Sequence, residues 1–230
     1  MNALLTLFAL GILALMPAAM AKTSVVVSEI PSLLNHKVAQ PAAYNHLLNS
    51  LQEIEVIFVP PARVEVEFRS KNANCLFPGS VKSMPGGDQL LQSDPVQKVQ
   101  AFIFTMRPYS NINQLNESVL GIRRGFTFGS FRERFSGNFV DLPNDVTAFT
   151  MLHKERLDGV VAYLPDALAA QHQIKMSPRA FYLQEQVIYE APDAFVCHPE
   201  HVGFVDYINI KIQQWKSSGQ LQKWFANAVN

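Results

Sequence analysis

The sequence predicts an α/β protein, because short apolar runs alternate with longer amphipathic stretches along most of the chain. Residues 99–105 form an almost unbroken apolar run, which is typical of a strand that is buried on both faces. After residues 107–108 the same alternation starts again. This pattern indicates βα units in a largely parallel sheet.

The strands are predicted from apolar runs, several of which end at proline, glycine or charged residues. For example, the run at 55–59 is stopped by two prolines, and the run at 75–77 by Pro-Gly. In chain order, the predicted strands are 24–28, 55–59, 75–77, 99–105, 119–123, one that begins at 139, 158–164, one or two within 181–189, and 195–197.

The helices are predicted from their start signals and from apolar stripes. Pro41 and Pro165 suit a first helical turn, while Thr127 and Asp145 are candidate N-caps. The last two helices carry apolar residues at three- and four-residue spacing. The predicted helices are 41–51, 62–70, 127–135, 145–156, 165–172, 201–217 and 221–229.

Residues 1–21 predict a secretory signal peptide that is cut after Ala21. They carry no charged side chain, they contain the apolar run 4–16, and small residues stand at positions 19 and 21. The apolar run is too short for a spanning helix. We therefore expect the mature chain outside the cytoplasm. The alternative is an uncleaved anchor, since no Lys or Arg precedes the apolar run.

The charge balance bears on possible partners. The 19 Lys and Arg residues equal the 19 Asp and Glu residues, so the formal net charge is zero. This balance gives no electrostatic case for nucleic acid or for an acidic membrane surface.

Two cysteines, Cys75 and Cys197, lie far apart in the sequence. In an oxidising compartment, an even number favours one disulfide. Because it would close a very long loop, such a bridge would contribute on the order of 4–5 kcal/mol. The alternative is two buried thiols that behave as small apolar side chains.

The motifs favour a binding protein over an enzyme. There is no Gly-x-Ser-x-Gly motif, so an α/β-hydrolase is unsupported. Residues 197–201 combine a thiol with two imidazoles, ligands that suit zinc, but Pro199 breaks their local geometry. We therefore expect no metal and no cofactor. An aromatic run at 126–135 predicts core packing, with an exposed patch for a partner protein as the alternative.

Four segments carry a resemblance to a known family. Residues 74–83 match its strand-to-loop segment, and Gln-Ser-Asp-Pro at 92–95 looks like its F-S-D-P-Y turn. Residues 113–125 look like its d-L-x-G-x-x-V-G-V-x-x-G-T segment, and residues 152–163 look like its L-x-x-G-R-x-D-A-V-V-x-D segment. In this order and spacing, they resemble the extracytoplasmic solute-binding proteins of the amino-acid transport class, which have the type 2 periplasmic binding protein fold.

The resemblance implies a two-lobe clamp, in which each lobe is a mostly parallel sheet flanked by helices. Lobe 1 would comprise residues 22–106 plus 194–230, and lobe 2 residues 107–193, joined by a two-segment hinge near 104–108 and 191–195. This layout places both cysteines in lobe 1. It further implies a periplasmic monomer that closes over a small-molecule ligand and works with an inner-membrane ABC permease or a membrane receptor.

In such a sheet, the ligand lies beyond the carboxyl ends of the strands, where helix N-termini present free N–H groups. Arg124 offers a guanidinium suited to a carboxylate. The predicted ligand-binding residues are Glu29, Pro78, Ser80, Ser83, Arg124, Phe126, Thr127 and Tyr163. The alternative is that the arginine pairs with a surface carboxylate, that the serines only shape a turn, and that the tyrosine belongs to the core.

Two departures from the family pattern bear on the ligand. The arginine that commonly holds the ligand carboxylate is missing, because Ser-Met-Pro-Gly stands at 83–86, and the acidic residue that holds the ammonium falls at Tyr163. An ordinary α-amino acid is therefore not expected, and a different small polar or anionic solute is. The alternatives are a sensing or scaffold protein of the same fold and a periplasmic dehydratase-type enzyme, for which Glu29 is the acidic candidate.

Overall fold

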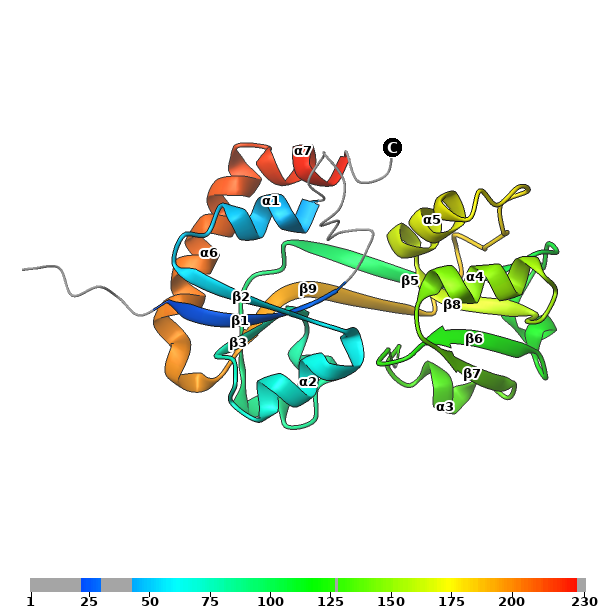
Figure 1. Ribbon diagram of the computed structural model, residues 1–230, viewed down its shortest axis with the longest axis horizontal. Helices are drawn as coiled ribbons and strands as arrows, with labels where there is room; N and C mark the ends of the chain where they lie inside the picture. Colours follow the sequence, from blue (N-terminus) through cyan, green and yellow to red (C-terminus); the bar gives the residue numbers. More distant parts are fainter. Residues whose placement is uncertain (1–21, 30–42, 127, 227–230) are drawn as a thin grey trace, which may run out of the picture.

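The computed structural model describes residues 22–29, 43–126 and 128–226 of the 230-residue chain. The predicted signal peptide (1–21) and Thr127 lie outside the described residues. The α/β fold class is confirmed: the chain forms two lobes, each with strands covered by helices, and two long strands pass from one lobe to the other (Figure 1). None of the helices in the described part is long and apolar enough to cross a membrane.

The first lobe is built around β1 (Thr23–Ser28), which pairs in parallel with β2 (Ile54–Val59) and β3 (Cys75–Gly79). Val25 and Val27 face one apolar core, and Val26 faces another, so the consecutive valines serve both sides of the sheet. The helices of this lobe are α1 (Ala43–Asn49), α2 (Pro61–Arg69), α6 (Val202–Ser217) and α7 (Gln220–Ala226).

The second lobe repeats this arrangement around β6 (Val119–Arg123), which pairs in parallel with β7 (Asn138–Leu142) and β8 (Gly159–Tyr163). One face of the sheet packs against α4 (Asp145–His153) and α5 (Leu164–Gln173). The other face packs against the segment that contains α3 (Phe131–Arg134).

The lobes are joined by β5 (Gln97–Thr105) and β9 (Tyr189–Cys197), which pair antiparallel from Gln97 opposite Asp193 to Ala101 opposite Tyr189. A short strand, β4 (Leu91–Gln92), also pairs with β9. The strands therefore form one continuous mixed sheet. It is parallel among β1, β2 and β3 and among β6, β7 and β8, and antiparallel wherever β5 or β9 pairs with a neighbour.

The packing changes within the crossing strands. Residues 101–104 already contribute to the cores of the second lobe, although the sequence assigned positions up to 106 to the first. The exact bounds of the two lobes stay a prediction.

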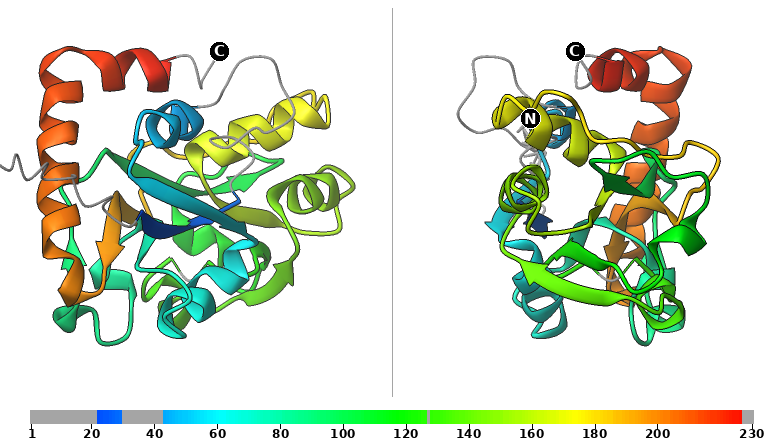
Figure 2. Two further views of the ribbon diagram at one scale, coloured as in Figure 1. Left: turned by 60° about the vertical axis from the view of Figure 1, so that its left-hand side comes forward. Right: turned by 90° about the vertical axis from the view of Figure 1, so that its right-hand side faces the viewer.

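The end of the chain returns to the first lobe. Val205, Ile208 and Leu221 pack in the same core as Tyr44 of α1. Figure 2 shows α6 along the outer side of this lobe, with α7 crossing its end. The expected return of the chain to complete its first half is therefore present.

Three local predictions were wrong. The helix expected from 127 to 135 is reduced to α3, because Phe128 and Gly129 adopt positive φ angles of 51° and 58° that interrupt it. Asn144, not Asp145, caps α4, since its side chain accepts a hydrogen bond of 2.8 Å from Thr147 N.

The third error concerns the segment before β9. The residues around Phe181 form an isolated bridge to Thr105 rather than a strand. The strand itself is continuous across Pro192, where it pairs only with β5, so the missing N–H faces an open edge.

The predicted disulfide is present. Cys75 and Cys197 lie opposite each other on β3 and β9, with their Cα atoms 4.1 Å apart and 122 positions apart in sequence. Both residues are fully buried. The bridge fastens the returning strand to the first lobe, and it removes Cys197 from any zinc site.

We expect the double variant Cys75→Ala/Cys197→Ala to lose on the order of 4–5 kcal/mol of unfolding free energy, because the cross-link restricts a very long loop in the unfolded chain. Urea unfolding without reductant measures the difference, and the same titration of the wild type with reductant provides the control. A loss below about 1 kcal/mol would contradict this account.

Candidate functional site

A cavity of about 200 Å³ lies between the two lobes. It sits at the carboxyl ends of parallel strands, where an α/β sheet places its ligands: Ser28 ends β1, Gly79 ends β3 and Tyr163 ends β8. The lining residues are Ser28, Pro61, Val64, Glu65, Leu76, Pro78, Gly79, Ser80, Ser83, Met84, Val99, Gly125, Phe126, Phe128, Tyr163, Pro165, Asp166, Tyr189, Ala191, Pro192 and Asp193.

The structure brings together five of the residues predicted to bind ligand. The residues of this set that line the cavity are Pro78, Ser80, Ser83, Phe126 and Tyr163. Glu29 and Arg124 are exposed and are not among its lining residues, and Thr127 lies outside the described residues. A ligand contact by any of the eight stays a prediction.

Arg124 lies on the outside of the second lobe, near a surface carboxylate. The pKa of Asp141 is lowered chiefly by hydrogen bonds of 3.0 Å from Arg132, with smaller contributions from the charges of Arg132 and Arg124. This position corresponds to the alternative in which Arg124 faces a surface carboxylate rather than the cavity.

The arginine that is buried beside the cavity is its neighbour, Arg123. Its side chain donates to Asp145 at 2.5 Å and to Asp166 at 3.0 Å, and its guanidinium lies 3.9 Å from the ring centroid of Phe126. All three charged residues are buried, with exposed fractions of 3%, 7% and 6%. Sequence reasoning missed this cluster, although an arginine inside an apolar strand is a signal for paired acids, since a buried charge is costly without a partner.

The cluster holds two carboxylates for one guanidinium. Burial raises the pKa of Asp145 to about 6, the charge of Arg123 opposes this shift, and the charge of Asp166 adds to it. Since Arg123 cannot neutralise both acids, the cluster carries an excess of negative charge when both are ionised.

A second buried acid, Asp193, projects from β9 where the crossing strands leave the first lobe. Its Oδ2 accepts hydrogen bonds from the Tyr44 hydroxyl and, at 2.9 Å, from Gln97 Nε2. Burial raises the pKa of Asp193 to about 6, and the negative charge of Asp166 adds to the rise, while both hydrogen bonds oppose it. No local sequence motif identifies this residue, because only the pairing of β5 with β9 brings it to the cavity.

Aromatic rings form the second-lobe wall of the cavity. The centroids of Phe128 and Tyr163 are 5.1 Å apart, those of Phe126 and Tyr163 are 5.8 Å apart, and Phe128 also contacts Tyr189 at 6.4 Å. Burial raises the pKa of the Tyr163 hydroxyl, which therefore stays protonated at neutral pH. The aromatic segment predicted to form a core thus contributes to the cavity as well.

Two contacts join the lobes across the cavity. Ser83, on a first-lobe loop, makes a side-chain hydrogen bond with Tyr189. Gly125, in the second lobe, has a φ of +90°, and a Cβ at this position would lie 2.7 Å from Ala62 N at the start of α2. Only glycine allows the two backbones to approach this closely.

Charge in the cavity is one-sided. Its lining includes three carboxylic acids, namely Glu65, Asp166 and Asp193, and among the described residues it includes no Lys, Arg or His. Ser28 is buried, and its Oγ has no hydrogen-bond partner within the described part of the chain. The site therefore offers aromatic faces, acidic groups and an unsatisfied hydroxyl.

Comparison of the sequence with protein-family models and with curated proteins finds no match. Solved structures resemble the fold closely at low identity. The GluR0 ligand-binding core in complex with L-glutamate has a TM-score of 0.74 and 11% identity, over 93% of this chain and 100% of that one. The ancestral amino acid-binding protein AncCDT-1, a precursor of cyclohexadienyl dehydratase, has a TM-score of 0.72 and 14% identity, over 91% and 96% of the two chains.

A third similar structure is the amino acid ABC transporter substrate-binding protein AbpA from Streptococcus pneumoniae, bound to L-arginine. It has a TM-score of 0.71 and 16% identity, over 91% of this chain and 94% of that one. At these identities, the likeness establishes the fold.

Asp193 predicts a specific pH dependence of stability. Its pKa is raised to about 6 in the folded protein, against about 3.9 in an unfolded chain. Between these values the folded state binds more protons than the unfolded state, so this residue lowers the unfolding free energy as pH rises. The full effect, above pH 6, is roughly 3 kcal/mol.

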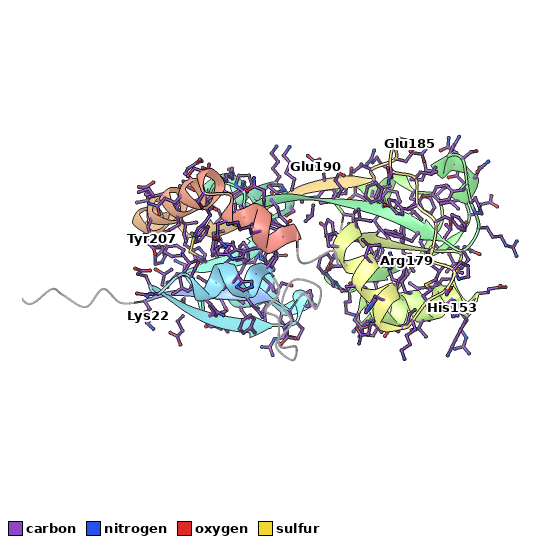
Figure 3. All side chains as sticks on the ribbon, turned by 90° about the horizontal axis from the view of Figure 1, so that it is seen from above. Lys22, His153, Arg179, Glu185, Glu190 and Tyr207 are labelled. Carbon is purple, nitrogen blue, oxygen red and sulfur yellow. A yellow bond between two sulfur atoms is a disulfide. The ribbon has the colours of Figure 1, made fainter. Side chains whose placement is uncertain are left out.

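We therefore compare the unfolding free energy of Asp193→Asn with that of the wild type. We expect the difference, variant minus wild type, to increase by roughly 3 kcal/mol from pH 4 to pH 7. Urea titrations at several pH values measure this difference. Glu190→Gln is the control, because Glu190 is an exposed acid on the same strand (Figure 3). Its pKa is lowered by hydrogen bonds from Lys98 and Gln100. If the difference in unfolding free energy between Asp193→Asn and the wild type does not change with pH, the raised pKa of Asp193 is refuted.

Proposed function

Because the chain has the two-lobe fold of the type 2 periplasmic binding proteins, we propose that it is an extracytoplasmic solute-binding protein that closes over one small molecule. The observation that carries this proposal is the cavity between the lobes, which is lined by both lobes and by the strands that join them. A ligand in this position contacts both halves and stabilises the closed arrangement.

The similar structures support a small solute as the ligand. Those of GluR0 and AbpA contain L-glutamate and L-arginine, respectively. In this chain, the contacts that hold an amino-acid carboxylate and ammonium in the resembling family are replaced at 83–86 and at Tyr163. We therefore propose a different solute. Since carboxylic acids rather than basic groups line the described part of the cavity, the anionic solute expected from the sequence is not supported.

The cellular setting follows the same reasoning. The proposed site of action is the periplasm, reached through cleavage of the predicted signal, and the protein acts as a monomer. The amino acid ABC transporter to which AbpA belongs supports an ABC permease as the partner. A membrane receptor is the other partner class that we propose, for a sensing role of the same two-lobe fold.

An enzymatic role is the second candidate. Asp193 lines the cavity, and its pKa of about 6 meets one requirement of a general acid or base. AncCDT-1, a precursor of cyclohexadienyl dehydratase, has the same fold. We favour binding without turnover, because Tyr44 and Gln97 already engage this carboxylate on the side of the first lobe.

A thermal-shift screen of the purified protein tests the proposal with amino acids, organic acids, amines and small peptides. We expect one class to raise the melting temperature saturably, since a ligand at a hundred times its Kd adds about 2.7 kcal/mol of stability. Mass spectrometry of the solute after incubation separates binding from catalysis. No stabilisation by any class would overturn the binding role, and conversion of the solute would favour the enzyme.

Gly125→Ala tests whether this binding requires closure. The new Cβ would collide with the backbone of α2 in the other lobe, and overpacking of this kind costs about 1–3 kcal/mol. We expect the affinity for a stabilising solute to fall by about tenfold, as calorimetry would measure. Gly86→Ala is the matched control, because Gly86 also has a positive φ, of +68°, but open space around it. Equal affinities of the two variants would refute a role for closure at this contact.

A further inference from the structure

We propose that the cavity takes a small organic cation with an ammonium group on an apolar body and no carboxylate. This inference rests on the proposed function, because it specifies the solute class for the same cavity. It follows from the charge around the cavity, its aromatic wall, its size and the buried Ser28 hydroxyl, which has no partner among the described residues.

The charge argument begins with the acids. Asp166 and Asp193 are buried and line the cavity. The guanidinium of Arg123 pairs with Asp166 and Asp145, whereas Asp193 forms no ion pair with any described residue. A buried negative charge without a compensating cation is costly. Burial raises the pKa of Asp193, because its charged form is disfavoured away from water. A cationic ligand would supply the missing charge.

The aromatic wall favours the same class of ligand. An ammonium group is attracted to the face of an aromatic ring, and this attraction strengthens where water is excluded. The protein already uses such a contact, because the guanidinium of Arg123 lies 3.9 Å from the ring centroid of Phe126. Phe128, Tyr163 and Tyr189 present further rings around the cavity.

Few groups around the cavity could stabilise the negative charge of a carboxylate on the ligand. Helix N-termini normally attract anions, and both α2 and α5 begin at the cavity. However, each begins with a proline in its first turn, Gly125 covers Ala62 N of α2, and Asp166 already occupies the first turn of α5. With acids in the lining and no basic side chain in its described part, the cavity discriminates against a carboxylate.

The size of the cavity and the hydroxyl of Ser28 further limit the class of ligand. A dry cavity of about 150 Å³ holds one benzene molecule, so the cavity of about 200 Å³ has room for a ring or a similar apolar body with a short amine-bearing chain. Ser28 Oγ, which is buried and unpartnered among the described residues, supplies an acceptor for an ammonium N–H.

Isothermal titration calorimetry with matched probes tests this inference at pH 7. The probes are 2-phenylethylamine and choline, which are cations, L-phenylalanine, which adds a carboxylate to the first, and 3-phenylpropionate, which has the carboxylate alone. We expect at least one of the two cations to bind about tenfold or more tightly than L-phenylalanine, and 3-phenylpropionate not to bind.

Variants assign the effect to the cavity. Asp193→Asn and Tyr163→Leu should each weaken binding of the cation by about tenfold, while Tyr163→Phe should retain it, because phenylalanine keeps the aromatic face. Glu190→Gln, which removes an exposed acid from the same strand as Asp193, should leave the affinity within about twofold.

Two results would overturn the inference: equal or tighter binding of L-phenylalanine or 3-phenylpropionate, or no binding of either cation. In both cases, the proposed function still stands if another class of solute stabilises the protein in the thermal-shift screen. The proposed function fails separately, when no class does so.

Discussion

The antiparallel pairing of β5 with β9 is the constraint on which the rest of this structure depends. From Gln97 opposite Asp193 to Ala101 opposite Tyr189, it is the hydrogen-bonded connection that makes one sheet of two lobes. It also places Asp193 and Tyr189 at the cavity, although neither belongs to a local motif. The hydrogen bonds of Asp193 with Tyr44 and Gln97 then fasten the crossing strands to α1, so the connection between the lobes is itself part of the site.

Local patterns predicted the elements well where burial alone decides them. The valines at 25–27 marked a strand that serves two cores, and the strand predicted at 119–123 has the bounds of β6. The prediction failed at α3, where positive φ angles override the helical spacing of the phenylalanines. At the site, the end of β6 was located correctly, but Arg124 was chosen over Arg123, since sequence spacing does not show which of two adjacent arginines turns inward. Asp193 could not be found, because long-range strand pairing positions it.

The contacts that join the two lobes also shape the cavity between them. Gly125 allows the second lobe to reach the backbone of α2, and Ser83 reaches Tyr189 from the first lobe. These contacts leave the acids and the aromatic rings facing a small, partly open volume between the lobes, in which electrostatic interactions are stronger than in bulk water. Discrimination between solutes in such a volume depends on a few charged groups, so the single shared guanidinium of Arg123 has a large influence on which solute is accepted.

The bridge between Cys75 and Cys197 has a topological consequence. With the polypeptide between them, the two sulfur atoms close a covalent ring, and the whole of β6, β7 and β8 lies inside that ring. A protease that nicks a surface loop of the second lobe once would therefore open the ring without releasing a fragment. The two pieces of the cut chain would stay covalently linked through the disulfide in the first lobe. The cut second lobe could then keep its pairing along β5 and β9.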